Sequence, residues 1–99
     1  MSTTMAIGAS GMRAAQAALD TAAHNIANLG TAGFRRQTVA ATPLPSGGVT
    51  TTLAQAAQAG DNLEADVVAQ LQARGAFVAN LQVFRAADRM LGTLLDATG

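Results

Sequence analysis

The chain has 99 residues, and much of its 49% apolar content is alanine, which fits one small helical domain with a marginal core of its own. Its formal net charge is zero and no long basic run occurs, which excludes the usual charge patterns of proteins that bind nucleic acids or anionic membranes. It has no cysteine, so disulfides and thiolate metal sites are excluded. No apolar run approaches the roughly 20 residues of a membrane span, and the start of the chain lacks a signal-peptide pattern, so we expect neither membrane insertion nor a cleaved leader.

The first predicted helix spans residues 3–29. Its small and apolar side chains recur in steps of three and four residues, as in a coiled coil, at Met5, Gly8, Met12, Ala15, Leu19, Ala22, Ile26 and Leu29. Small residues alternate with large ones in this stripe, so we expect a partner helix to approach closely at Gly8, Ala15 and Ala22. The outer face carries mostly alanine, serine, threonine and glutamine rather than charged residues, which indicates that it is covered as well.

The first helix leads into the sequence HNIANLGTAGF, which ends at Phe34. We expect Gly30 to end the helix in a left-handed conformation and Gly33 to provide a second permissive point. The side chains of Asn25 and Asn28 can pair with backbone groups left free at the helix end, or cross to a neighbouring helix and fix its register. Phe34 is then the apolar anchor that holds the turn against the helices.

The middle segment, residues 30–60, contains both prolines of the chain and a Gly-Gly pair. It predicts either a β-hairpin, with strands near residues 37–41 and 49–53, or a flexible linker. A two-stranded hairpin is marginally stable by itself, so a hairpin here needs to lie on the helices or on a neighbouring molecule.

The second predicted helix spans residues 61–96, with Asp61 or Asn62 as its N-cap and Glu64 as the partner of Asp61 in a capping box. One stripe contains Leu63, Val67, Gln70, Arg74, Phe77, Leu81, Phe84, Asp88, Leu91 and Leu95. A second stripe lies beside its C-terminal half and contains Val83, Ala87, Met90 and Leu94. A helix that is apolar over more than one face is covered by several neighbours. The sequence therefore predicts a mainly α fold, in which two long helices pair as an antiparallel coiled-coil hairpin and other copies or chains cover the rest.

Few residues are candidates for chemistry. His24, the one histidine, has Asp20 four residues before it but no nucleophile beside it, which favours a surface contact over an acid–base site. Arg35 and Arg36 can hold a phosphate, although a solvated or inter-chain ion pair is the more common role of such residues. No group of ligands indicates a metal or a cofactor. We therefore expect no enzyme, no catalytic residue and no cofactor.

The sequence ALDTAAHNIANLGTAGFRRQ resembles the N-terminal signature of bacterial flagellar rod and hook proteins, in which a leucine-rich helix runs into N-N-I-A-N, T-x-G-F/Y and basic residues. The matching residues are Asn25, Ile26, Ala27, Asn28, Thr31, Gly33, Phe34 and Arg35. His24 stands where the family usually has asparagine. The stretch from Asn62 to Asp96 is similar to the other end of the same family, at Asn62, Leu63, Glu64, Ala76, Phe77, Ala79, Asn80, Ala87, Asp88, Met90, Leu91, Thr93, Leu94 and Leu95.

This resemblance implies a structural protein without catalysis, a single axial coiled-coil domain over residues 1–99 whose copies stack helically into the hollow rod or hook of the flagellum. It implies export through the flagellar type III machinery without a cleaved signal, followed by assembly in the periplasmic rod. The implied partners are other copies of the chain and other rod and hook proteins. The expected inter-helix and assembly contacts are Met12, Leu19, Asn25, Ile26, Asn28, Thr31, Gly33, Phe34, Phe77, Asn80, Leu81, Phe84, Leu91 and Leu95.

Besides His24, two features depart from the family pattern. Gly75 stands where relatives commonly have arginine or another polar helix former, which predicts a close helix approach or a kink. The middle segment is too short for the additional domains of most relatives, which indicates the thin, domain-poor proximal class of rod subunit or a reduced homologue. The alternative to a rod subunit is a small helical adaptor or binding module of the flagellar export or assembly apparatus.

The free chain should be partly disordered at low concentration and gain helix on assembly, because the apolar stripes have too few partners within one molecule. Circular dichroism spectra and thermal melts over a range of protein concentrations measure this directly. Full helicity with a cooperative melt, unchanged by dilution, would contradict the prediction.

Overall fold

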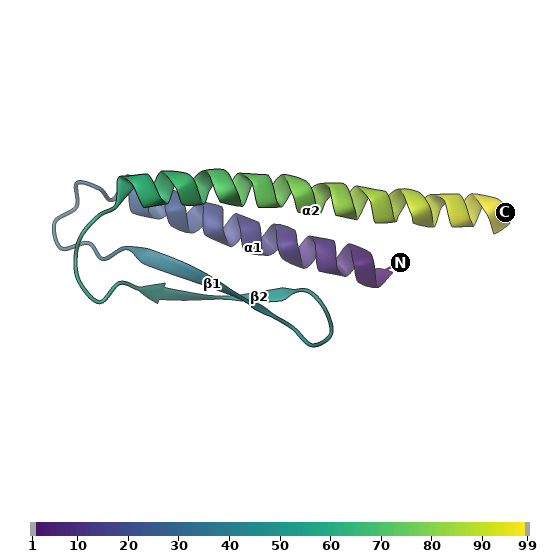
Figure 1. The fold of residues 1–99 in the computed structure, drawn as a ribbon, viewed down its shortest axis with the longest axis horizontal. Helices are drawn as coiled ribbons and strands as arrows, with labels where there is room; N and C mark the ends of the chain where they lie inside the picture. The colour runs from purple at the N-terminus through teal and green to yellow at the C-terminus, as the bar shows by residue number, and fades with distance from the viewer. Residues whose placement is uncertain (1, 99) are drawn as a thin grey trace.

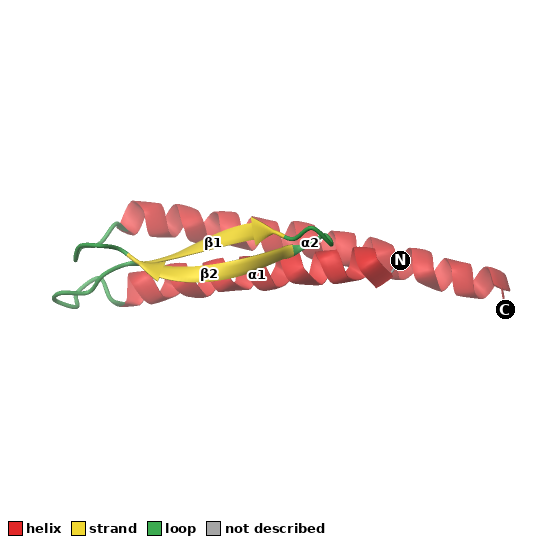
Figure 2. Cartoon of the chain, turned by 90° about the horizontal axis from the view of Figure 1, so that it is seen from below, coloured by secondary structure: helices red, strands yellow, loops and turns green. Residues whose placement is uncertain are grey.

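Two long antiparallel helices and a β-hairpin form an elongated molecule of 62 × 24 × 14 Å (Figure 1). The computed structural model describes residues 2–98, with helix α1 (Ser2–Ala27), strands β1 (Gln37–Pro43) and β2 (Val49–Gln55), and helix α2 (Leu63–Thr98). The hairpin lies along the helix pair (Figure 2). The predicted mainly α fold is therefore confirmed. Neither helix of the described chain has the length and hydropathy together that a membrane span requires.

Close packing of small residues joins α1 to α2. Ala15 and Ala22 of α1 and Ala73 and Ala87 of α2 are buried. A Cβ atom on Gly8 would lie only 3.4 Å from the backbone oxygen of Asn80, so the helices do approach closely at this glycine, as predicted. The remaining members of the predicted α1 stripe are all buried or half-buried, which confirms the pattern along this helix.

The stripe predicted on α2 is not buried at its two charged positions, nor at Leu63, Val67 and Leu95, which are also exposed. Ala73 and Ala87 face α1, whereas the neighbouring Arg74 and Asp88 are exposed. Burial is confirmed at the stripe positions around these two residues, since Gln70, Phe77, Phe84 and Leu91 are all half-buried. The helix is rotated slightly from the predicted orientation because alanine at the interface brings the helices close and leaves both charged side chains in solvent.

The middle segment is a hairpin and not a linker. The register runs from Gln37 opposite Gln55 to Pro43 opposite Val49, so both strands extend two residues beyond the predicted ranges. In the connecting loop the Leu44 carbonyl accepts a hydrogen bond of 3.0 Å from the Gly47 amide. Gly47 and Gly48 have φ angles of 92° and 86°, a left-handed conformation that favours glycine.

The tip of the hairpin is held on α1 by one serine. The Ser10 hydroxyl donates to the Ile7 carbonyl at 2.9 Å and accepts from the Val49 amide at 3.1 Å. A Cβ atom on Gly48 would lie 2.7 Å from the Ser10 oxygen, so the backbone of the tip lies directly against the helix. This contact supplies the support that an isolated hairpin lacks.

The helix ends differ from the prediction in two ways. Asn62 is the N-cap of α2, because its Oδ1 accepts a 3.1 Å hydrogen bond from the Ala65 amide. The third helical position is thus Ala65, so the predicted capping box with Glu64 is wrong. Gly30 does not have a positive φ angle, and the left-handed residue after α1 is Gly33, with φ of 75°.

Gly75 makes no close approach, since nothing outside its own helix backbone lies within 4 Å of the position of its missing Cβ. That part of the prediction is wrong, and α2 continues without a break through this residue.

Replacing Gly48 or Gly75 with alanine should have opposite effects on stability. Gly48→Ala forces a left-handed alanine against Ser10 and should cost about 1–2 kcal/mol, with faster amide exchange at Val49. Gly75→Ala is the matched control and should add roughly 0.5–1 kcal/mol, because its site is open and helical. Urea unfolding and hydrogen exchange test both variants. Equal and small effects would show that the hairpin tip is not held as described.

Candidate functional site

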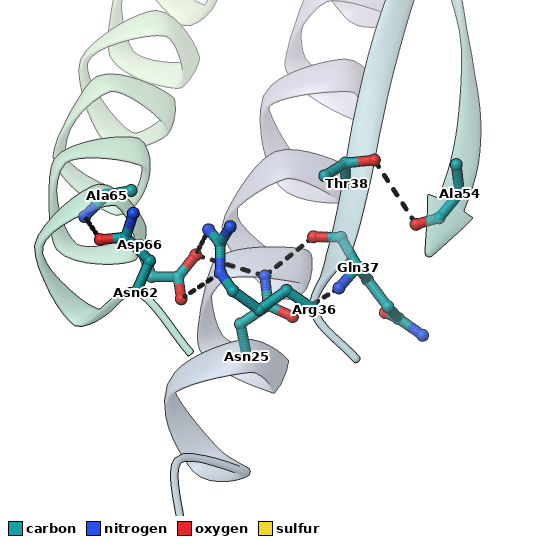
Figure 3. A network of polar contacts seen from close by, with 8 residues as sticks. All are labelled: Asn25, Arg36, Gln37, Thr38, Ala54, Asn62, Ala65 and Asp66. Carbon is teal, nitrogen blue, oxygen red and sulfur yellow. Dashed lines mark hydrogen bonds and ion pairs between the residues drawn. The ribbon is translucent and has the colours of Figure 1, made fainter. Parts of the chain in front are cut away.

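A buried polar cluster joins α1, β1 and α2 at the end of the molecule where the chain turns (Figure 3). We call Asn25, Arg36, Gln37 and Asp66 the turn cluster. Asn25 and Asp66 are 2% and 1% exposed, so their polar atoms depend on partners within the protein. No buried side-chain nitrogen or oxygen in the described chain lacks a hydrogen bond.

Asn25 uses both ends of its side-chain amide. Its Oδ1 accepts a 2.8 Å hydrogen bond from the Gln37 amide, and its Nδ2 donates to the Gln37 carbonyl at 2.9 Å. Nδ2 also donates to Oδ1 of Asp66 at 3.3 Å. One side chain from the last turns of α1 thus fixes the first residue of β1 and reaches the first turns of α2, which is the register-setting role predicted for this asparagine.

Arg36 completes the cluster with a two-pronged contact to Asp66. Its Nε donates to Oδ2 at 3.2 Å, and its terminal guanidinium nitrogen donates to Oδ1. This hydrogen bonding raises the pKa of Arg36 above its usual value. An arginine pKa that rises on folding adds stability at every pH below the unfolded-state value, so this contribution persists across the physiological range. The predicted solvated or inter-chain role of Arg36 is wrong, because β1 begins beside the start of α2.

Local sequence explains why these groups meet. The Asn62 cap starts α2 one turn before Asp66, and an acidic side chain near a helix N-terminus is favoured by the helix dipole. The Asp66 carboxylate faces inward, where three hydrogen bonds from Asn25 and Arg36 satisfy it. The sequence analysis did not identify Asp66 as a site residue. An acidic residue in the first helical turn, next to positions that face inward, could have indicated a buried ion pair.

The turn after α1 is held by Asn28 and Thr31. The side-chain nitrogen Nδ2 of Asn28 donates to the His24 carbonyl at 2.8 Å, and Oδ1 of the same side chain accepts from the Thr31 hydroxyl at 3.2 Å. The Thr31 carbonyl in turn accepts a 3.3 Å bond from the Phe34 amide. With the left-handed Gly33, these bonds give the turn a defined shape, and Asn28 satisfies a backbone group at the helix end as predicted.

Phe34 is half-buried where the segment after α1 meets the segment before α2. Its ring meets that of His24 edge to face at 5.4 Å, and its carbonyl accepts a 3.1 Å hydrogen bond from the Gly60 amide. A hollow of about 260 Å³ lies beside it, lined by Asn28, Leu29, Thr31, Gly33, Phe34, Ala59, Gly60 and Asp61. The turn residues therefore form a shaped surface next to the buried cluster.

The other candidate contact residues are distributed along the helix pair. Half-buried positions hold Met12, Leu19, Ile26, Phe77, Asn80, Leu81, Phe84 and Leu91. The Asn80 side chain donates to the Ala76 carbonyl at 2.8 Å and fills the space over Gly11. Leu95 is 63% exposed near the far end of α2. The structure thus gathers the asparagines and Phe34 near the turn, and spreads the large apolar candidates along the helices.

The groups considered for chemistry do not come together. Asp20 accepts a 2.8 Å hydrogen bond from Gln16, while His24 contacts Phe34. Arg35 donates to Gln55 at 2.8 Å. Among the described residues no three histidine or acidic side chains lie close enough together to hold a metal ion.

Residues 5–35, which comprise most of α1 and the turn through Phe34, match the family model described as flagella basal body rod protein. These residues carry the flagellar rod signature. The match confirms the resemblance seen in the N-terminal sequence, and it covers Asn25, Asn28, Thr31 and Gly33. Comparison with curated proteins gives no match. The rod family is structural, so the match supports a rod-related structural role, a place in the basal body, and assembly with other flagellar rod proteins.

Asp66→Asn should destabilise the fold by about 1–3 kcal/mol, because it removes a buried charged partner from Arg36. Asp20→Asn is the control, since its carboxylate is exposed and its loss should change stability by less than about 0.5 kcal/mol. Urea unfolding of both variants at one fixed protein concentration compares them. Equal stabilities for the two would show that the turn cluster does not hold the segments together.

Proposed function

We propose that this chain is a structural subunit of the flagellar basal-body rod, which assembles helically with its own copies and with other rod proteins through its two helices. The observation that carries the proposal is the combination of a rod-signature turn with an incompletely covered helix. Large apolar side chains remain exposed along α2 at Leu63, Val67, Val68, Leu71, Val78, Val83, Met90, Leu94 and Leu95. Exposure on this scale marks a surface that other protein chains cover.

The shape and chemistry of the molecule support the same role. The helices lie along the 62 Å axis, so stacked copies can form an extended structure. Fully buried apolar residues in the described chain are alanines, which contribute little buried area each, so the exposed apolar side chains of α2 leave further burial for assembly. A rod subunit needs no reacting groups, and in this role the chain is not an enzyme and takes no cofactor.

The proposal includes the route to the site of assembly. A subunit of the periplasmic part of the rod reaches it through the flagellar type III export machinery, without a cleaved signal peptide. Export through a narrow channel requires an unfolded chain. A core built from alanine and one polar cluster is easily unfolded, which suits this route.

Deleting the gene should block rod completion and abolish motility, and the wild-type gene supplied in trans should restore both. Electron microscopy of purified basal bodies and swimming assays provide the readouts, and an epitope-tagged chain should co-purify with intact basal bodies. A fully motile deletion strain with normal basal bodies that lack the tagged chain would refute the proposal. A stable monomer or dimer without rod association would instead favour the small adaptor.

A further inference from the structure

An open groove of about 620 Å³ lies between α1, α2 and the hairpin. The hairpin packs on α1 and makes no close backbone contact with α2, so the groove remains between them. Small residues dominate its walls, including Ala14 and Ala18 of α1 and Ala69 and Ala76 of α2. Among the described residues that line it, none is charged. The groove therefore has room for large apolar side chains that this chain does not supply to it.

The same face of α2 changes from small to large side chains along its length. Ala69, Ala76, Val83 and Met90 are seven residues apart in turn, so they occupy one heptad position. The first two line the groove, whereas Val83 is 47% and Met90 is 59% exposed. Leu94, one turn further, is 54% exposed. We call Val83, Met90 and Leu94 the outer stripe; about half of each of these side chains is exposed in the described part of the chain.

The outer stripe and the groove are complementary in size and register. A shift of two heptads, about 21 Å along a helix, places Val83 and Met90 of one copy opposite Ala69 and Ala76 of another. Large side chains then meet small ones at each level, as in knobs-into-holes packing. Both surfaces are apolar, so their contact removes exposed apolar area from each copy.

The charges favour a second copy as the occupant. The part of the chain around the turn, residues 20–66, contains four acidic and two basic side chains, whereas the rest contains four arginines and two aspartates. The hairpin, which belongs to residues 20–66, contributes no charge. A parallel neighbour shifted along the axis brings the basic end of one copy toward the acidic end of the next, and opposite charge favours this encounter.

We propose that the outer stripe of each copy packs into the alanine groove of the next copy, in a parallel arrangement staggered by two heptads. This contact is heterologous, so each added copy leaves one groove and one stripe free and the assembly remains open. The inference rests on the proposed rod function, to which it adds the two surfaces that meet. It also assigns a role to the hairpin, which forms one wall of the groove.

Cysteine cross-linking of purified protein tests this contact, because the chain has no cysteine of its own. In Ala76→Cys/Met90→Cys the two positions are about 21 Å apart on one helix, so a disulfide forms only between molecules. Mild oxidation should give a ladder of dimers, trimers and larger products. Gly75→Cys/Met90→Cys is the matched control: Gly75 adjoins Ala76 but does not line the groove, and it should give no ladder.

Two results would overturn the proposal. One is equal cross-linking with cysteine at positions 75 and 76, or none with either. The other concerns an antiparallel pair of molecules, which would place Met90 of one copy opposite Ala69 of its partner. In that case Ala69→Cys/Met90→Cys would form only a dimer, and Ala76→Cys/Met90→Cys would form no ladder. Circular dichroism at the concentration used verifies folding of every variant.

Filling the groove gives a second measurement that needs no cross-link. Ala76→Trp should abolish self-association in sedimentation velocity, whereas Gln82→Trp, exposed and outside the groove, should leave it unchanged. Unchanged association of Ala76→Trp would contradict the stripe-in-groove contact. If the tagged chain is found in basal bodies but no ladder forms, only this inference fails. If the ladder forms but the chain is absent from basal bodies, the rod function fails.

Discussion

The turn cluster is the interaction on which the arrangement of the chain depends. Asn25 satisfies both backbone groups of Gln37 and reaches Asp66, while Arg36 pairs with the same carboxylate. The end of α1, the start of β1 and the start of α2 meet there. If any of these segments shifted along its neighbours, buried polar groups would be left unpaired. The alanine side chains between the helices carry no polar group that a shift would leave unpaired.

The polar contacts that join the segments lie at one end of the helix pair. Near the turn, polar contacts define the position of α2, and small residues let α1 approach it. Exposed large apolar side chains occur along the whole of α2, from Leu63 and Leu71 near the turn to Met90 and Leu94. Local stability should therefore fall from the turn toward the end of α2, because the polar contacts that join the segments are concentrated at the turn.

Much of the fold was predictable because it depends on local pattern. The stripe on α1 places Ala15, Ala22 and Ile26 on one face, and the structure keeps that face covered. The prolines and glycines of the middle segment allowed either a hairpin or a linker. The support of the hairpin by Ser10 was not predicted, because a serine inside a helix gives no signal of a distant partner. The α2 stripe was displaced because a heptad count cannot distinguish Ala73 from the adjacent Arg74 without knowing how closely the helices approach.

The candidate site was predictable only in part, for a related reason. Asn25 was recognised as a residue that sets register, but its partners lie in β1 and α2, and sequence alone does not specify which distant groups meet. Asp66 is an acid in the first turns of a helix, where a solvent-exposed role near the positive end of the dipole is common. Its burial follows from the path of the turn, which returns Arg36 to the start of α2 and converts a surface acid into the centre of the cluster.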